Sequence, residues 1–214
     1  MPANCYLCGS SQNITRDHIP PEGFFPPDSK QNLITVPCCR KCNDSYKLDD
    51  QATRLWLASC RLCSDQAKWI WENKVTKTFQ RSAKLKTHLA RFVGSKTFNT
   101  PSGQIQVPTV ANYSGQVDRF LIRICKGMFA YLLPEFDYSK TNFQVMNLLP
   151  TPVNRQMLEG ILPVLKHEAR GGTVFKVWYD VLKERPDTGL FILMFYHGAC
   201  FVVFFGDAAN APKQ

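Results

Sequence analysis

Two pairs of cysteines near the start of the chain have the spacing of zinc ligands. Cys5 and Cys8 form one Cys-x-x-Cys pair, and Cys39 and Cys42 form a second pair thirty residues further on. Each pair presents two sulfurs from a tight turn, and two such turns complete the tetrahedron that Zn²⁺ prefers. Cys38 could replace Cys39 as a ligand, but only Cys39 reproduces the spacing of the first pair. The sequence therefore predicts a structural zinc held by these two pairs.

An Asp-His pair and an asparagine accompany this cysteine framework. Asp17 directly precedes His18, and Asn43 directly follows Cys42. A histidine side chain can take a proton from an attacking water, and carboxylate and amide oxygens suit a divalent cation. Hydrolysis of a phosphodiester needs an activated water and neutralisation of the charge on the phosphate oxygens. The residue types therefore fit a hydrolytic centre for phosphodiesters.

Three short segments together resemble an HNH endonuclease, a family that places a ββα-metal motif around a zinc-knuckle pair. The resemblance covers residues 5 to about 50. One departure is that the third motif position is Asn43 rather than histidine. The segments are Asp17-His18-Ile-Pro-Pro, Asn32-Leu-Ile-Thr-Val-Pro-Cys and Cys39-Arg-Lys-Cys42-Asn43.

This resemblance implies a role for each matching residue. Asp17 resembles the family's carboxylate metal ligand, and His18 resembles the general base. Asn32 matches the middle asparagine, which braces the loop that holds the histidine. Asn43 stands where the last His or Asn of the motif coordinates the metal. An asparagine there makes the ligand set harder in character, which favours Mg²⁺ or Mn²⁺ over zinc at the catalytic centre.

The positive charge of the chain is concentrated just after the cysteine framework. The net charge is +9, and residues 51–100 alone carry ten Lys and Arg against two Asp and Glu. Such a segment is typical of a nucleic-acid partner, although a solubilising helix surface has the same composition. The side chains that we expect near phosphate, each with a plain surface role as the alternative, are Arg16, Arg40, Lys41, Lys74, Lys77, Arg81 and Lys84.

Composition excludes several other classes of protein. No apolar run reaches membrane-spanning length, and the first residues lack the basic and apolar regions of a signal peptide. We therefore expect a cytoplasmic protein with no membrane partner, whose nine cysteines serve as metal ligands or buried thiols. The cysteines that we expect to be buried thiols are Cys60, Cys63, Cys125 and Cys200.

Periodicity and turn residues predict the elements that carry these side chains. Four prolines between residues 20 and 27 favour a loop there. Asp49 and Asp50 are expected to cap the helix that follows, and His88, His167 and His197 have no partner at ligand spacing. We expect strands at 32–36, 104–110 and 173–181, a hairpin over 190–205, helices at 42–48, 50–71, 74–92, 116–133 and 151–168, and a break with a turn over 94–103.

The sequence therefore predicts an α+β protein in three parts: an HNH-like ββα-metal module with structural zinc (1–50), a basic helical segment (51–96) and a C-terminal α+β domain with a terminal hairpin (97–214). We expect metal-dependent nicking or cleavage of DNA, with RNA the less favoured substrate. Family habit suggests phage defence or a mobile-element context. The alternatives are a zinc-dependent nucleic-acid-binding protein without catalysis, and a nuclease subunit that needs an ATPase or another partner. The apolar C-terminal strands also allow a homodimer.

Overall fold

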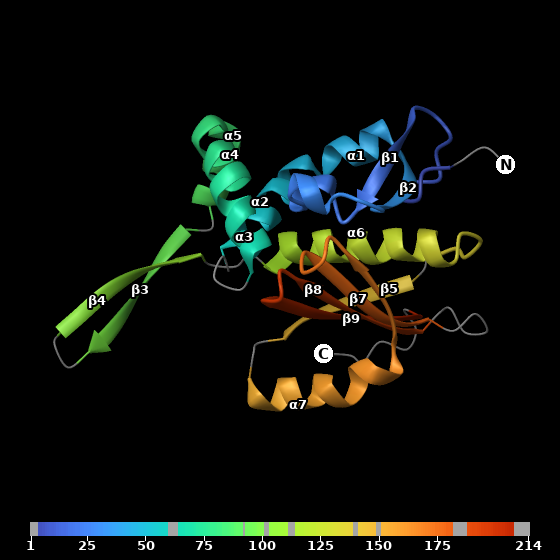
Figure 1. Ribbon diagram of the computed structural model, residues 1–214. Coiled ribbons are helices and arrows are strands. Elements are labelled where there is room, and N and C mark those ends of the chain that lie inside the picture. Colours follow the sequence, from blue (N-terminus) through green and yellow to red (C-terminus); the bar gives the residue numbers. More distant parts are fainter. Residues whose placement is uncertain are drawn as a thin grey trace.

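A computed structural model describes residues 4–59, 64–91, 93–100, 103–110, 114–138, 141–148, 151–181 and 188–207. The fold mixes helices with three antiparallel sheets, which confirms the α+β class. Figure 1 shows the layers: the N-terminal elements lie over the long helix α6, which covers one face of the C-terminal sheet, and α7 lies on the other face. Within the described residues, every helix is too short or too polar to cross a membrane.

The N-terminal module is a two-stranded hairpin followed by a short helix. Strands β1 (Ile14–Ile19) and β2 (Ile34–Cys39) pair antiparallel, and α1 (Arg40–Ser45) begins where β2 ends. The proline-rich connection contains only 3₁₀ turns at Glu22–Phe24 and Pro27–Ser29, as expected for a loop. Strand β2 runs past Pro37, which the sequence had suggested as its end, because a two-stranded sheet leaves an outer edge where the missing N–H is tolerated.

The basic segment is a series of short helices rather than the two long ones expected. One cause of the division is Ser82, whose backbone leaves the helical region (φ −98°, ψ 96°) while its hydroxyl caps α5 by accepting from the Leu85 N–H at 3.1 Å. Cys60 and Cys63 fall between α2 and α3, outside the described residues. The elements are α2 (Lys47–Ala58), α3 (Asp65–Ile70), a π-helical turn (Trp71–Val75), α4 (Thr76–Arg81) and α5 (Ala83–Ala90).

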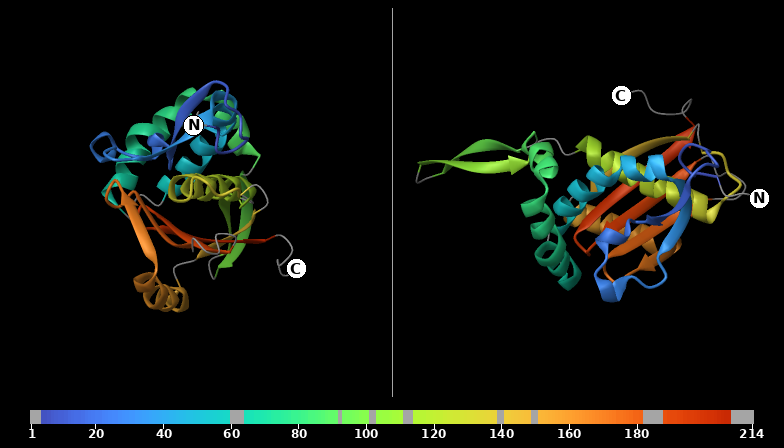
Figure 2. Two further views of the ribbon diagram at one scale, coloured as in Figure 1. Left: turned by 90° about the vertical axis from the view of Figure 1, so that its right-hand side faces the viewer. Right: turned by 90° about the horizontal axis from the view of Figure 1, so that it is seen from above.

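The expected break over 94–103 is wrong. Strand β3 (Val93–Thr100) pairs antiparallel with β4 (Gly103–Val110), and Thr100 pairs with Gly103, so only the turn lies where it was expected. The hairpin projects from the body of the protein (Figures 1 and 2). Its first strand was missed because the small residues Gly94 and Ser95 weaken the local strand signal, and pairing with β4 is a tertiary event.

The C-terminal half forms a five-stranded antiparallel sheet in the order β5-β9-β8-β7-β6. The strong helix expected at 116–133 and the terminal hairpin are confirmed. The helix expected over 151–168 ends at Ile161, and residues 166–170 form an edge strand instead. Strand β5 was not expected. The elements are α6 (Ser114–Leu132), β5 (Thr141–Leu148), α7 (Pro152–Ile161), β6 (Lys166–Arg170), β7 (Phe175–Val181), β8 (Gly189–Phe195) and β9 (Ala199–Asp207).

Helix α6 joins the N-terminal module to the sheet. A single cluster of buried residues draws members from all three parts expected from the sequence. Phe24 of the module stacks on Phe120 of α6 with ring centroids 5.1 Å apart. A Cβ atom added at Gly127 of α6 would lie 2.4 Å from Ile19 Cδ1, so the glycine allows the helix to approach β1 closely. The inner face of β1 is therefore covered by α6 (Figure 2).

Candidate metal centre and the adjacent carboxylate

The four expected cysteines converge on one point. Cys5 and Cys8 lie in the turn before β1, while Cys39 ends β2 and Cys42 lies in α1. Their sulfur atoms all lie within 4.8 Å of one another, and the Cys8 and Cys39 sulfurs are 3.7 Å apart. A tetrahedral zinc with bonds of about 2.3 Å requires sulfur separations of about 3.8 Å. The cluster can therefore hold a zinc ion.

Backbone hydrogen bonds lower the pKa of one of these thiols, Cys5, whereas burial and the neighbouring Cys39 and Cys8 sulfurs raise the pKa of Cys42. The Cys42 N–H donates to Cys39 Sγ at 3.4 Å, and the Gly9 N–H donates to the Cys5 carbonyl at 2.8 Å to close the first turn. Burial acts to raise the pKa of Cys5, but backbone hydrogen bonds at Cys39, Leu7 and Cys8 outweigh it and lower the pKa to about 6. Among the four thiols, Cys5 is therefore the one best prepared for zinc, which binds the thiolate form.

The neighbouring Cys38 is not part of the cluster. Its sulfur is buried, lies 4.0 Å from Cys5 Sγ and donates to the Cys39 carbonyl at 3.6 Å. Burial, followed by the nearby Cys5 and Asp17, raises the pKa of Cys38 far above its usual value. Cys38 thus behaves as a core thiol. Cys125 and Cys200 are also buried, as expected.

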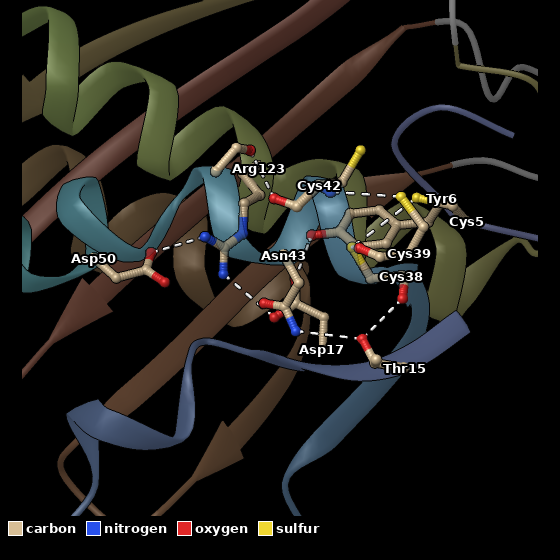
Figure 3. Close-up of polar contacts among 11 residues, drawn as sticks. Cys5, Tyr6, Thr15, Asp17, Cys38, Cys39, Cys42, Asn43, Asp50 and Arg123 are labelled. Carbon is tan, nitrogen blue, oxygen red and sulfur yellow. Dashed lines mark hydrogen bonds and ion pairs between the residues drawn. The ribbon is translucent and has the colours of Figure 1, made fainter. Parts of the chain in front are cut away.

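Asp17 lies on the inner face of β1, sealed from solvent. Only 4% of its side chain is exposed. The Tyr6 hydroxyl donates to Oδ2 at 2.8 Å, and an Arg123 guanidinium nitrogen donates to Oδ1 at 3.3 Å (Figure 3). Burial and the Asp17 charge raise the pKa of Tyr6, so its hydroxyl stays protonated and remains a donor. Both carboxylate oxygens of Asp17 are therefore engaged within the protein.

Arg123 comes from α6 and connects Asp17 to a second carboxylate. Its other terminal nitrogen donates to Asp50 Oδ1 at 2.8 Å, and its guanidinium carbon lies 4.8 Å from the centre of the Tyr46 ring. Only 1% of the Arg123 side chain is exposed. Burial acts to lower the pKa of Arg123, but Asp50 and Asp17 together raise it. The guanidinium thus stays charged, and one cation serves two carboxylates.

Asn43 contacts the strand that carries Asp17. Its amide nitrogen donates to Thr15 Oγ1 at 3.4 Å, and Thr15 lies two residues before Asp17 on β1 (Figure 3). The donor atoms are of the kind that Mg²⁺ and Mn²⁺ prefer. In this arrangement, however, a divalent cation does not fit, because the Arg123 guanidinium already occupies and neutralises Asp17.

His18 and Asn32 are placed differently from what the motif implies. His18 points to the opposite face of β1 from Asp17, on the side of Arg16, because side chains alternate along a strand. It is half-buried. Asn32 is exposed in a left-handed turn (φ 55°), and among the described residues its side chain forms no hydrogen bond that would brace the loop.

The basic side chains divide into exposed and engaged ones. Lys74 is half-buried, and its ammonium donates to the carbonyls of Gly23 and Phe25 at 3.2 and 3.0 Å. Burial, then Lys30 and Arg54, lower the pKa of Lys74 to about 8. Lys74 therefore anchors the proline-rich loop, which corrects its expected role as a nucleic-acid contact. The exposed members are Arg16, Arg40, Lys41, Lys77, Arg81 and Lys84.

Sequence reasoning missed three members of this site: Tyr6, Asp50 and Arg123. Asp50 was expected only to cap a helix, and it does lie in the first turn of α2. The sequence did indicate that Arg123 is buried, because it is a charged residue within the apolar run Phe-Leu-Ile-Arg-Ile-Cys. A buried charge requires a partner of opposite sign, but its identity could not be read from the sequence.

Comparisons with known proteins leave the site to be interpreted from its geometry. No known protein family, no curated protein and no solved structure matches this chain.

Proposed function

We propose that this protein hydrolyses phosphodiester bonds of nucleic acid, DNA before RNA, as a nuclease of the HNH type. The observation that carries the proposal is the order strand, strand, helix around a four-cysteine cluster. Asp17 and His18 lie on β1, and Asn43 of α1 donates a hydrogen bond to Thr15 of the same strand (Figure 3). These are the residue types and the local topology that the resemblance to HNH endonucleases implies.

The outer face of β1 supplies the residues to which we assign the chemistry. His18 accepts a proton from a water molecule as the water oxygen bonds to phosphorus and the bond to the departing oxygen breaks. Arg16 lies two residues away on the same face, is exposed, and can hold the phosphate oxygens. We assign no step to a divalent ion, because Arg123 holds Asp17.

Binding of the nucleic acid is assigned to the basic helices. Lys77 and Arg81 of α4 and Lys84 of α5 are all exposed. Each phosphate that they neutralise releases counterions, so affinity should fall steeply with salt. The triple charge reversal of these residues to glutamate should weaken binding to a DNA duplex and flatten its salt dependence. If the affinity is unchanged and insensitive to salt, the basic helices α4 and α5 do not bind nucleic acid and are only a solvated surface.

The test of catalysis is His18→Ala. Plasmid and single-stranded substrates are incubated with Mg²⁺, with Mn²⁺ and with EDTA, and the products are resolved on gels. The variant should keep its zinc content, fold and DNA affinity, while cleavage falls by a factor on the order of 10²–10⁴. His167→Ala is the matched control, because His167 is exposed on the edge strand β6. Equal rates for His18→Ala and the parent would remove His18 from the proposed mechanism.

One observation favours a second candidate, a zinc-stapled nucleic-acid-binding protein without catalysis. Asp17 is buried and ion-paired, and His18 points to the other face of the strand. In this reading the charged residues of the motif stabilise the fold. Salt-sensitive DNA binding with no cleavage under any of the metal conditions would favour this candidate, or a nuclease that depends on a partner protein, over an independent nuclease.

A further inference from the structure

The least expected feature of the molecule is a buried arginine at the position where the HNH resemblance implies a metal. We propose that the Arg123 guanidinium and a divalent cation compete for the Asp17 carboxylate, and that Arg123 holds the cation's place in the arrangement described above. This deepens the proposed function, on which it rests for the identity of the competing ion. Under this proposal, helix α6, which carries Arg123, determines whether a divalent cation binds to Asp17 on β1.

Three contacts keep Arg123 in place. Its two terminal nitrogens donate to Asp17 at 3.3 Å and to Asp50 at 2.8 Å, and its planar face lies over the Tyr46 ring. A guanidinium remains charged at any physiological pH and matches two carboxylates with a fixed fork of donors. Gly127, one turn further along α6, lets the helix pack directly on Ile19. The guanidinium is therefore held by charge, by shape and by the packing of its helix.

Charge balance explains why the two cations exclude each other. With Arg123 present, the pair Asp17 and Asp50 carries one uncompensated negative charge. A divalent ion bound beside the guanidinium would put three positive charges next to two negative ones in a buried site. Without the guanidinium, the carboxylates of Asp17 and Asp50 would keep two uncompensated negative charges, which one divalent ion with its preference for oxygen ligands would neutralise.

The experiment measures Mn²⁺ binding to the full-length, zinc-loaded protein by electron paramagnetic resonance of the free ion. Arg123→Met should bind Mn²⁺ at least about 100-fold more tightly than the parent protein, near the upper end of ordinary coupling between two ligands. Mn²⁺ should also raise the melting temperature of this variant alone. Asp17→Asn in the Arg123→Met background should abolish both effects.

Arg119→Met is the matched control. Arg119 lies one turn earlier on α6, pairs with Asp49 at 3.2 Å and is 57% exposed, so its loss should leave Mn²⁺ binding unchanged. Arg123→Gln, which is uncharged but can still donate to Asp17, replaces Arg123→Met if that variant does not fold. A parent protein that already binds Mn²⁺ tightly through Asp17, or a folded Arg123 variant that gains no affinity, would overturn the proposal.

The two proposals fail in different ways. If the Arg123 variants bind Mn²⁺ more tightly but no variant cleaves nucleic acid, the nuclease proposal is wrong and the proposed competition between Arg123 and the cation is supported. Mn²⁺-dependent cleavage by the parent, with binding indifferent to Arg123, would do the reverse.

Discussion

Each end of the β1–β2 hairpin carries groups of the kind that bind metals. The two ends differ in whether a side chain of the protein already neutralises those groups. At the end where β2 meets α1, four cysteine sulfurs gather within 4.8 Å of one another, and Arg40 and Lys41, which lie between Cys39 and Cys42 in sequence, are exposed. Toward the other end, on β1, the Asp17 carboxylate already has a guanidinium and a hydroxyl as partners. Asp17 therefore has a buried counter-charge supplied by the chain itself. The comparison shows that matching residue types do not make a metal site unless the surrounding chain leaves their charge unbalanced.

Helix α6 creates this difference. It supplies Arg123 from a position 106 residues after Asp17 and covers the inner face of the strand. The cysteine cluster keeps one ligand, Cys8, exposed to solvent. A zinc ion can therefore reach the cluster without any rearrangement, whereas a cation for Asp17 has to displace an internal one.

The largest expected effect is loss of the zinc. Cys39→Ser should remove the bound metal and unfold the N-terminal module, because zinc binding contributes on the order of 10 kcal/mol to small domains of this kind. Elemental analysis and limited proteolysis provide the measurement. Cys38→Ser is the control, since its sulfur lies outside the cluster and its loss should leave the zinc content at one per chain. If Cys39→Ser kept its full zinc content, the four-cysteine cluster would not be the zinc site, and the comparison of the two ends would fail.

Removal of Arg123 should have the next largest effect. In EDTA-treated protein that keeps its zinc, Arg123→Met should lower the free energy of unfolding by about 3–5 kcal/mol, because two carboxylates stay buried without a counter-charge. Arg119→Met, which breaks an exposed pair, should cost at most about 1 kcal/mol. Urea denaturation monitored by tryptophan fluorescence separates the two. Similar losses would mean that the buried pairs are no more important than a surface contact.

Tyr6 links the two ends, since it follows Cys5 in sequence and donates to Asp17. Tyr6→Phe removes one hydrogen bond to a buried charge and should cost about 1.5–3 kcal/mol of stability. Zinc content should not change. A variant that loses zinc together with stability would show that the two ends fold as a unit and cannot be compared as separate sites.

The smallest expected effect is a pH dependence from Asp50. Burial raises the pKa of Asp50 to about 6, against the partial compensation from Arg123. The folded protein then binds more protons than the unfolded chain between pH about 4 and 6, so the free energy of unfolding falls as pH rises through this window. Asp50→Asn should remove this slope while Asp49→Asn keeps it. A slope of the opposite sign would mean that the Arg123 ion pair outweighs burial at Asp50.

Much of the molecule was readable from local pattern. The cysteine spacing predicted the cluster, because two tight turns each fix a pair of sulfurs within a few residues. The apolar stripe predicted α6, and the His-Gly pair between two apolar runs predicted the β8–β9 hairpin. Strands β3, β5 and β6 were not predicted, because each depends on pairing with a neighbouring strand that local composition does not specify.

The state of the carboxylate was decided by tertiary structure alone. The sequence placed Asp17, His18 and Asn43 in a nuclease-like order, and local alternation along β1 then set the first two on opposite faces. Which face is buried depends on α6, and so does the identity of the cation that neutralises Asp17. Short-range spacing determines which side chains can meet a ligand, whereas the balance of buried charge is a sum over elements that meet only in the folded chain.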